Sequence, residues 1–115
     1  MEYKTISEDN CKVITLTGEI DLQTSPIARE QILQTLKNNQ HVLIEMADVE
    51  YIDSSGIASL VEGYQDAKSR KLYFGLVNIS SATQQVLALA RLDKIFQIFD
   101  SVSDGLAEIN KDSTL

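Results

Sequence analysis

The sequence predicts a single α/β domain in which an N-terminal hairpin is followed by alternating strands and helices, giving a mixed, mostly parallel sheet packed with helices. The first observation is size: 115 residues, 43% of them hydrophobic, suit one domain with a modest core. The second is an opening pair of segments whose polar and apolar residues alternate, as in a hairpin. The third is a later alternation of apolar, strand-like segments with segments of helical periodicity, which is typical of parallel strands joined by right-handed crossovers.

The hairpin is predicted over residues 2–7 and 12–17, which are rich in β-branched side chains with a period of two. Glu8-Asp9-Asn10 between them is typical of a turn. The run Gly18-Glu19-Ile20-Asp21-Leu22 is expected to end the hairpin. The first two strands should therefore pair antiparallel, unlike the strands that follow.

A first helix is predicted from Ser25-Pro26, with serine at the cap and proline in the first turn, to Asn38-Asn39. Its buried face is expected to carry Ala28, Ile32, Leu33 and Leu36. The next segment, residues 41–46, is mostly apolar, which is typical of a strand inside a sheet. A second helix is predicted over residues 55–69, where apolar side chains recur at helical spacing: Ile57, Leu60, Val61, Tyr64 and Ala67.

Two more strands and two more helices are predicted in the last third of the chain. Residues 72–77 are expected to form a buried strand, and residues 95–99 alternate as a strand. Between them, Ser81-Ala82-Thr83-Gln84 is a capping-box pattern. It should open a helix that buries Val86, Leu87, Leu89 and Ala90. A final helix is predicted from residues 101–104 to about Ile109.

Composition and charge exclude several classes of function. The one cysteine, Cys11, cannot form an internal disulfide, which fits a reducing compartment. The net charge of −7 disfavours nucleic acid and leaves two interpretations open, a basic protein partner or an acidic surface that serves solubility. The first residues lack the pattern of a signal peptide, and the apolar runs are too short to cross a membrane. We therefore expect a cytoplasmic domain over residues 1–110, without membrane insertion, and a polar C-terminal tail over residues 111–115.

Little in the sequence points to catalysis, a cofactor or a metal. The five glycines are too dispersed for a phosphate-binding loop. His41 is the only histidine, and at the start of a strand it is expected on the surface rather than in a catalytic triad. Cys11 has no second cysteine at metal-ligand spacing. The carboxylates between residues 45 and 53 could hold a hard cation, although a solvated loop is the commoner use of such a run. We expect a protein that is not an enzyme.

The most informative segment is Asp53-Ser54-Ser55-Gly56, between the third strand and the second helix. Functional sites in parallel sheets lie at the carboxyl ends of strands, and residues 18–21 and 78–80 also follow strands. The first N–H groups of a helix lack intrahelical partners and favour negative charge. Ser54 could therefore cap the helix or accept a phosphate, and composition alone favours the cap.

Three segments together resemble the signatures of STAS domains: Gly18-Glu19-Ile20-Asp21, Tyr51-Ile52-Asp53-Ser54-Ser55-Gly56-Ile57 and Leu92-Asp93-Lys94-Ile95-Phe96-Gln97-Ile98-Phe99. Within that family the chain is most similar to small bacterial anti-sigma-factor antagonists. The resemblance runs from about residue 3 to residue 109, in the expected order and spacing. The four residues Asp-Ser-Ser-Gly would be a weak signal alone, and the two flanking segments make the signal specific.

The resemblance implies a partner-switching mechanism. In this family the unphosphorylated antagonist binds an anti-sigma factor that is also a serine kinase, and the sigma factor is released. The kinase phosphorylates the serine directly after the aspartate, here Ser54, which dissociates the complex, and a PP2C-type phosphatase restores the active form. The implied docking surface on this chain comprises Asp21, Asp53, Ser55 and Gly56. The chain lacks an ATP-binding motif, as a kinase substrate should, and a monomer or weak dimer is expected.

Other uses of these residues stay open. Asp21 could be only a turn residue, and Gly56 could serve close packing or backbone freedom at the turn. Ser55 competes with Ser54 as the phosphate acceptor, since only the position in the family separates them. Tyr51 and Ile57 could contact a partner, but burial in the core is expected.

Two other functions compete with the antagonist. The first is a receiver-type phosphoacceptor, with an acyl phosphate on Asp53 and Mg²⁺ held by Glu8-Asp9. Such a domain should open with an apolar parallel strand, whereas Tyr3–Ser7 alternates and enters a hairpin. The second is a STAS domain that acts outside a sigma-factor cycle, such as the accessory subunit of a lipid-transport ABC complex.

Overall fold

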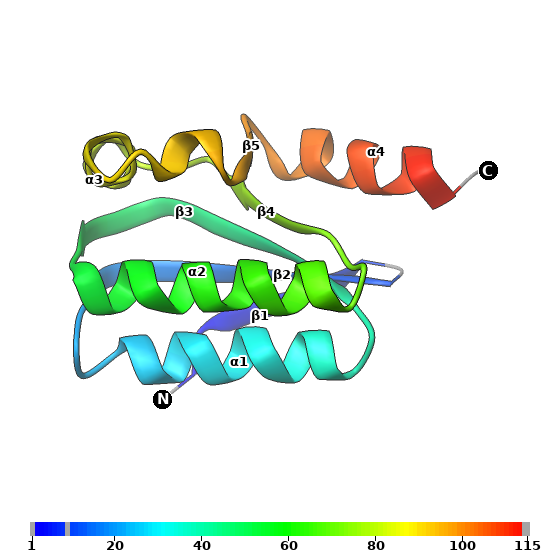
Figure 1. The fold of residues 1–115 in the computed structure, drawn as a ribbon, viewed down its shortest axis with the longest axis horizontal. Helices are drawn as coiled ribbons and strands as arrows, with labels where there is room; N and C mark the ends of the chain where they lie inside the picture. The colour runs from blue at the N-terminus through cyan, green and yellow to red at the C-terminus, as the bar shows by residue number, and fades with distance from the viewer. Residues whose placement is uncertain (1, 9, 114–115) are drawn as a thin grey trace.

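Five strands form one mixed sheet in the order β1-β2-β3-β4-β5 in the computed structural model, which describes residues 2–8 and 10–113 (Figure 1). The strands are β1 (Lys4–Glu8), β2 (Cys11–Ile20), β3 (His41–Ile52), β4 (Phe74–Val77) and β5 (Gln97–Phe99). The helices are α1 (Ser25–Lys37), α2 (Ser54–Ser69), α3 (Ser81–Leu89), the 3-10 helix η1 (Leu92–Lys94) and α4 (Val102–Ser113). β1 pairs antiparallel with β2, and the other neighbours are parallel. The predicted fold class is confirmed.

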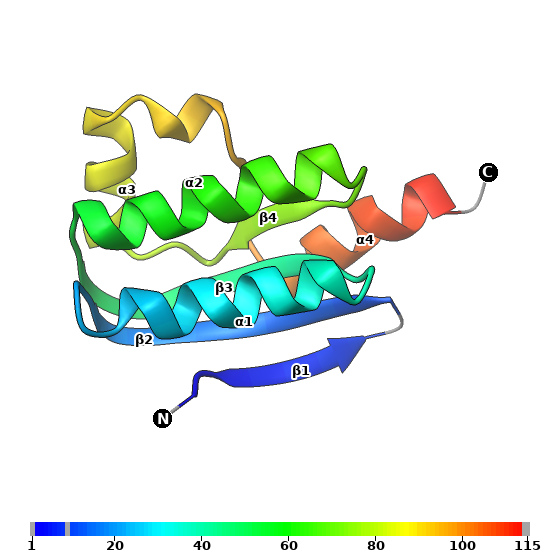
Figure 2. The same ribbon diagram turned by 60° about the horizontal axis from the view of Figure 1, so that its bottom comes forward.

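The helices cover the two faces of the sheet unequally. α1 and α2 lie side by side over one face, and α4 packs on the other (Figures 1 and 2). The larger core lies between the sheet and the α1–α2 pair, and its fully buried members include Ile14, Ile32 and Ile44. A smaller core under α4 comprises Cys11, Val13, Leu43, Val77 and Ile109. The carboxyl end of β3 leads directly into α2, and residues 21–24 connect the carboxyl end of β2 to the start of α1.

The strands β2 and β3 extend further than the sequence predicted. β2 runs through Gly18 to Ile20, and β3 runs to Ile52 rather than ending at Met46. Their pairing shifts register twice, between Thr15/Thr17 and between Gly18/Glu19. Gly18 has a φ of +73°, a conformation that glycine adopts without strain. Residues 47–52, which lie outside the predicted strand, therefore belong to β3, and only Asp53 separates β3 from α2.

Several helix details differ from the sequence prediction. Thr24 rather than Ser25 precedes α1, and Ser80 rather than Ser81 caps α3 by accepting a hydrogen bond from the Thr83 amide. Leu89, predicted in the core, is 87% exposed, because α3 buries only Thr83 and Leu87 completely. α4 continues to Ser113, four residues beyond the predicted end.

Three smaller corrections concern the strand ends. Residues 95 and 96 precede β5, and Ile95 is exposed. His41, expected on the surface, is half-buried, and its Nδ1 accepts a hydrogen bond of 3.0 Å from the Tyr73 amide. Asp9 of the predicted turn and residues 114–115 of the predicted tail lie outside the described residues. Within residues 2–8 and 10–113, no helix combines the length and apolar character needed to cross a membrane.

Candidate functional site

The junction of β3 and α2 is organised by the carboxylate of Asp53. Asp53 is the N-cap of α2, with extended backbone angles, and its amide donates to the Ile20 carbonyl at 3.1 Å. One carboxylate oxygen, Oδ1, accepts hydrogen bonds from the Ser55 amide at 2.9 Å and the Gly56 amide at 3.1 Å. Two N–H groups that the helix itself leaves without partners are thereby satisfied. The helix cap that composition favoured for Ser54 is thus formed by Asp53.

The two adjacent serines of the junction lie in different environments. The Ser55 hydroxyl is half-buried and donates a hydrogen bond of 2.5 Å to Asp53 Oδ1. Ser54 is exposed, and no partner for its hydroxyl is found among the described residues. The bond from Ser55, with the Ser55 and Gly56 amides, holds the pKa of Asp53 below its usual value, because each stabilises the charged carboxylate. The junction therefore presents one free hydroxyl beside an ionised carboxylate.

Gly56 allows α2 to start close against the ends of two strands. A Cβ added at this position would lie 2.6 Å from Ile52 Cγ1, 2.9 Å from Ile20 Cγ2 and 3.1 Å from the Ile20 carbonyl oxygen. Both isoleucines are buried in the larger core. Of the two explanations that the sequence left open for Gly56, close packing applies. Gly56 is buried, so it supports the surface without forming part of it.

Asp21 orders the neighbouring loop between β2 and α1. Its Oδ1 accepts hydrogen bonds from the Gln23 amide at 2.9 Å and from the Thr24 amide and hydroxyl at 3.2 Å. The Thr24 hydroxyl shares its single proton between Asp21 Oδ1 and the Glu19 carbonyl oxygen, which is 2.8 Å away, and it accepts a hydrogen bond from the Asp21 amide at 2.9 Å. This is the local geometry by which an aspartate closes a turn. The half-buried side chain of Asp21 therefore uses its hydrogen bonds to hold the β2–α1 loop, which lies beside the β3–α2 junction.

Two exposed apolar side chains flank the junction, and the sequence analysis predicted neither of them to be on the surface. Tyr51, expected in the core, is 52% exposed, and Leu22 in the β2–α1 loop is 78% exposed. Tyr51 pairs with Glu19 across β2 and β3, beyond the second register shift. Ile57 is half-buried and packs against the larger core, so the predicted burial agrees with the structure better for Ile57 than for Tyr51. Tyrosine is enriched in the interfaces of protein complexes.

The acidic residues of β3 do not converge on a cation site. In the part of the chain that the structure describes, no group of three or more His, Cys, Asp or Glu side chains could hold a metal ion. Glu45 instead accepts a hydrogen bond of 3.3 Å from the Asn78 side chain.

The polar segment after β4 also approaches β3, since the Ser80 amide donates to the Met46 carbonyl at 3.2 Å. The junction is thus a surface of hydroxyl, carboxylate and apolar groups, suited to contact with another macromolecule.

Comparison with known proteins assigns this architecture to a family. The model of the STAS domain matches residues 2–105, and the chain belongs to the STAS domain family. The anti-sigma-F factor antagonist RsfB of Mycobacterium tuberculosis is 29% identical over 91% of this chain and 87% of its own length. The recognition of the family from the three sequence segments is confirmed.

Solved structures share the fold over nearly the whole chain. A Thermotoga maritima protein superposes with a TM-score of 0.86 at 22% identity, covering 94% of both chains, which shows the fold. An anti-sigma factor antagonist from Mycobacterium paratuberculosis has a TM-score of 0.81 at 26% identity, covering 94% of this chain and 92% of its own. The unphosphorylated form of the antagonist SpoIIAA also has a TM-score of 0.81, at 15% identity, over 95% of this chain and 96% of its own.

Proposed function

We propose that this protein is an anti-sigma-factor antagonist of the partner-switching type. Its unphosphorylated form binds an anti-sigma factor that has serine kinase activity, and phosphorylation of Ser54 ends that binding. A PP2C-type phosphatase then restores the binding form. The names of its relatives support the first part of this proposal, since RsfB and the Mycobacterium paratuberculosis protein are both anti-sigma factor antagonists.

The observation that carries the proposal is the difference between two neighbouring hydroxyls. Ser54 is exposed and its hydroxyl is free of any partner that the described residues supply, whereas the Ser55 hydroxyl is bonded to Asp53. Phosphate transfer requires a hydroxyl that can enter another protein's active site. Ser54 meets this requirement without breaking a hydrogen bond of the cap, and Ser55 would have to give one up.

The electrostatics of the junction explain how a phosphate would switch binding. A phosphoserine adds about −1.5 to −2 charge near neutral pH. At Ser54 that charge would adjoin the carboxylate of Asp53, whose pKa the Ser55 hydrogen bond lowers. The N-terminus of α2 offsets part of this charge within the chain. A partner surface matched to one carboxylate and a small hydroxyl would meet a bulkier and more negative group, so the complex would weaken while the fold is retained.

The test is a phosphorylation and binding assay with ATP and the cognate anti-sigma factor kinase. We expect phosphate incorporation from ATP into wild type and into Ser55→Ala, and none into Ser54→Ala. The kinase should bind Ser54→Ala as well as it binds wild type, and it should bind Ser54→Asp weakly. Ser55→Ala is the matched control, because it removes the adjacent hydroxyl and leaves Ser54 in place. Undiminished phosphorylation of Ser54→Ala would sink the assignment.

A further inference from the structure

We propose that β1 is a dimerisation edge, at which two copies of this chain pair their β1 strands antiparallel about a twofold axis through Ile6. The two five-stranded sheets would then form one continuous sheet. The inference rests on the free edge of the sheet and on the sequence of β1, and it is independent of any role of Ser54.

β1 is an uncovered edge strand. It is the first strand in the sheet order, its five residues are all exposed, and Figure 2 shows no segment on its far side. Beyond its pairing with β2, no hydrogen bond from residues 4–8 is found within the described part of the chain. The opposite edge, β5, has only three residues. A free edge presents unpaired N–H and C=O groups that another strand can satisfy.

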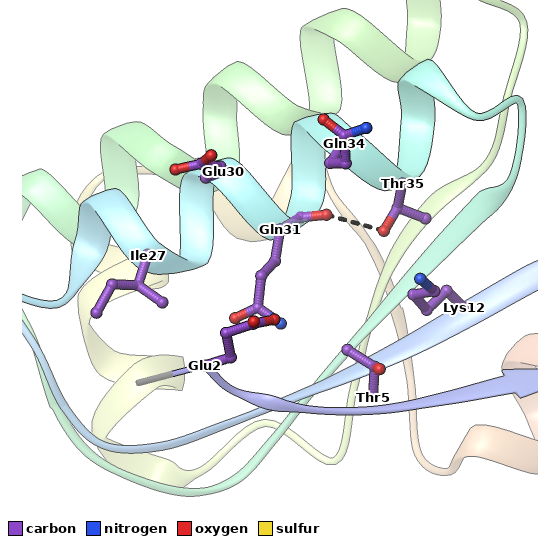
Figure 3. Close-up of a pocket in the computed structure, with 8 residues that line it drawn as sticks. All are labelled: Glu2, Thr5, Lys12, Ile27, Glu30, Gln31, Gln34 and Thr35. Atoms are coloured by element: carbon purple, nitrogen blue, oxygen red, sulfur yellow. Dashed lines mark hydrogen bonds between the residues drawn. The ribbon is translucent and has the colours of Figure 1, made fainter.

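The helix layer stops short of β1 and leaves its edge open. A groove of about 380 Å³ separates α1 from the strands, with Gln31 and Gln34 on the helix side and Thr5 and Lys12 on the strand side (Figure 3). The start of β1 is nevertheless fixed, because the Gln31 side chain accepts from the Tyr3 amide at 2.7 Å and donates to the Tyr3 carbonyl at 2.9 Å. The strand is thus ordered before any partner binds, which lowers the entropy lost on association.

The sequence of β1, Lys4-Thr5-Ile6-Ser7-Glu8, complements itself in the antiparallel direction. With Ile6 opposite its own counterpart, Lys4 lies opposite the partner's Glu8, and Thr5 lies opposite the partner's Ser7. Opposite charges and apolar side chains that face each other across strands stabilise the pairing, and like charges weaken it. A parallel, in-register arrangement would place the two Lys4 residues together, and an antiparallel slip by two would place Lys4 opposite an isoleucine. The charge pattern therefore selects both the direction and the register.

The apolar side chain at the centre of this register supports the same pairing. Ile6 is 46% exposed, although large aliphatic side chains are usually buried. It pairs with Val13 of β2, whose side chain belongs to the core under α4. In the dimer the two Ile6 side chains would meet on the α4 side of the joined sheet. The exposed part of Ile6 would thereby leave water, which favours association.

The proposed dimer leaves the β3–α2 junction free. β1 aligns with residues 11–15 of β2, whereas the junction lies beyond Ile20, about 16 Å further along the strand at roughly 3.3 Å per residue. Stable interfaces bury about 1,200–2,000 Å² in total, more than a pair of five-residue strands supplies. We therefore expect a dimer that forms with rising concentration rather than a permanent one.

Sedimentation equilibrium on the full chain tests the proposal through charge reversal. We expect the average mass of wild type to rise with concentration toward twice the 12.8 kDa of one chain. Lys4→Glu places glutamates opposite each other in the homodimer, and Glu8→Lys places lysines opposite each other, so each variant alone should dimerise roughly tenfold more weakly or worse. An equimolar mixture of the two variants should dimerise again, because both cross-strand pairs then have opposite charge. The double variant Lys4→Glu/Glu8→Lys should also dimerise.

A control and three outcomes decide the result. Glu50→Lys makes the same change of charge as Glu8→Lys at an exposed position outside β1, and it should dimerise like wild type. The proposal is overturned if wild type stays monomeric up to about 1 mM. The β1 edge would then be open to pairing with a strand of a different protein instead. Single variants that dimerise like wild type also overturn it. A mixture that fails to dimerise overturns the antiparallel register centred on Ile6.

Discussion

The replacement Gly56→Ala tests the idea that close packing, rather than backbone freedom, requires glycine at the start of α2. The new methyl group would lie 2.6 Å from Ile52 Cγ1 and 2.9 Å from Ile20 Cγ2, and 3.1 Å from a backbone oxygen that cannot rotate away. Overpacking of this kind costs about 1–3 kcal/mol. Alanine gains up to about 1 kcal/mol over glycine in a helix. Subtracting the full gain from the overpacking cost leaves a fall of roughly 0–2 kcal/mol in the free energy of unfolding. We expect the upper part of this range, because the contact with the backbone oxygen cannot be relieved by a side-chain rotation.

Urea unfolding followed by far-UV circular dichroism measures this difference, with an unchanged m-value as the sign that the native and denatured states keep their compactness. Ala58→Gly, on an exposed position of the same helix, is the matched control, and it should cost about 1 kcal/mol through helix propensity alone. A Gly56→Ala variant as stable as wild type, or more stable, would refute the packing argument. It would show that the two isoleucines yield without cost.

Three further predictions concern titratable groups. Burial lowers the pKa of His41, so we expect its NMR titration midpoint to lie below about 6.5. The free energy of unfolding should decline as the pH falls through that midpoint, because the unfolded chain binds the proton more readily. A higher midpoint would contradict this. Burial raises the pKa of the Cys11 thiol to about 12, so the folded chain holds almost no thiolate at a pH of about 8. A disulfide reagent at that pH should therefore react only with the unfolded chain. The Ser55 hydrogen bond lowers the pKa of Asp53, whose ionisation stabilises the fold above a pH of about 3.9. Asp53→Asn should therefore unfold at lower urea than wild type at neutral pH, and the gap should close as acid protonates the wild-type carboxylate; a gap that persists in acid would be evidence against the charge effect.

The architecture and the place of the site follow from local patterns in the sequence. Apolar residues alternate along β2 and recur at helical spacing along α2, and each pattern reflects burial against the same core. Once the order of strands and helices is known, parallel pairing places the ends of β2 and β3 at one edge of the sheet. Asp53 and Asp21 could therefore be assigned to one region from the sequence, because chain topology decides their proximity.

The failure at Tyr51 occurred where long-range packing overrides the local pattern. Two register shifts between β2 and β3 reset which face each residue occupies, and Tyr51 lies on the surface although its burial in the core was expected. The register shifts depend on what the neighbouring strand presents and are not encoded in Tyr51 itself. The error at Leu89 has a different cause. Leu89 lies two residues after Leu87, about 200° further around the helix, so the face of α3 that buries Thr83 and Leu87 leaves Leu89 exposed.

Under the proposed function, the cap of α2 would distinguish the two serines of the junction. Asp53 must accept the first amides of α2 to start the helix at the end of β3, and its Oδ1 then lies within reach of the Ser55 hydroxyl. That bond withdraws Ser55 and leaves Ser54 as the free hydroxyl of the turn. Gly56 packs closely against Ile20 and Ile52 at the start of α2, whereas Ser54 is exposed. Under the proposed function, a phosphate on Ser54 would therefore lie on the surface, where the binding partner meets its charge.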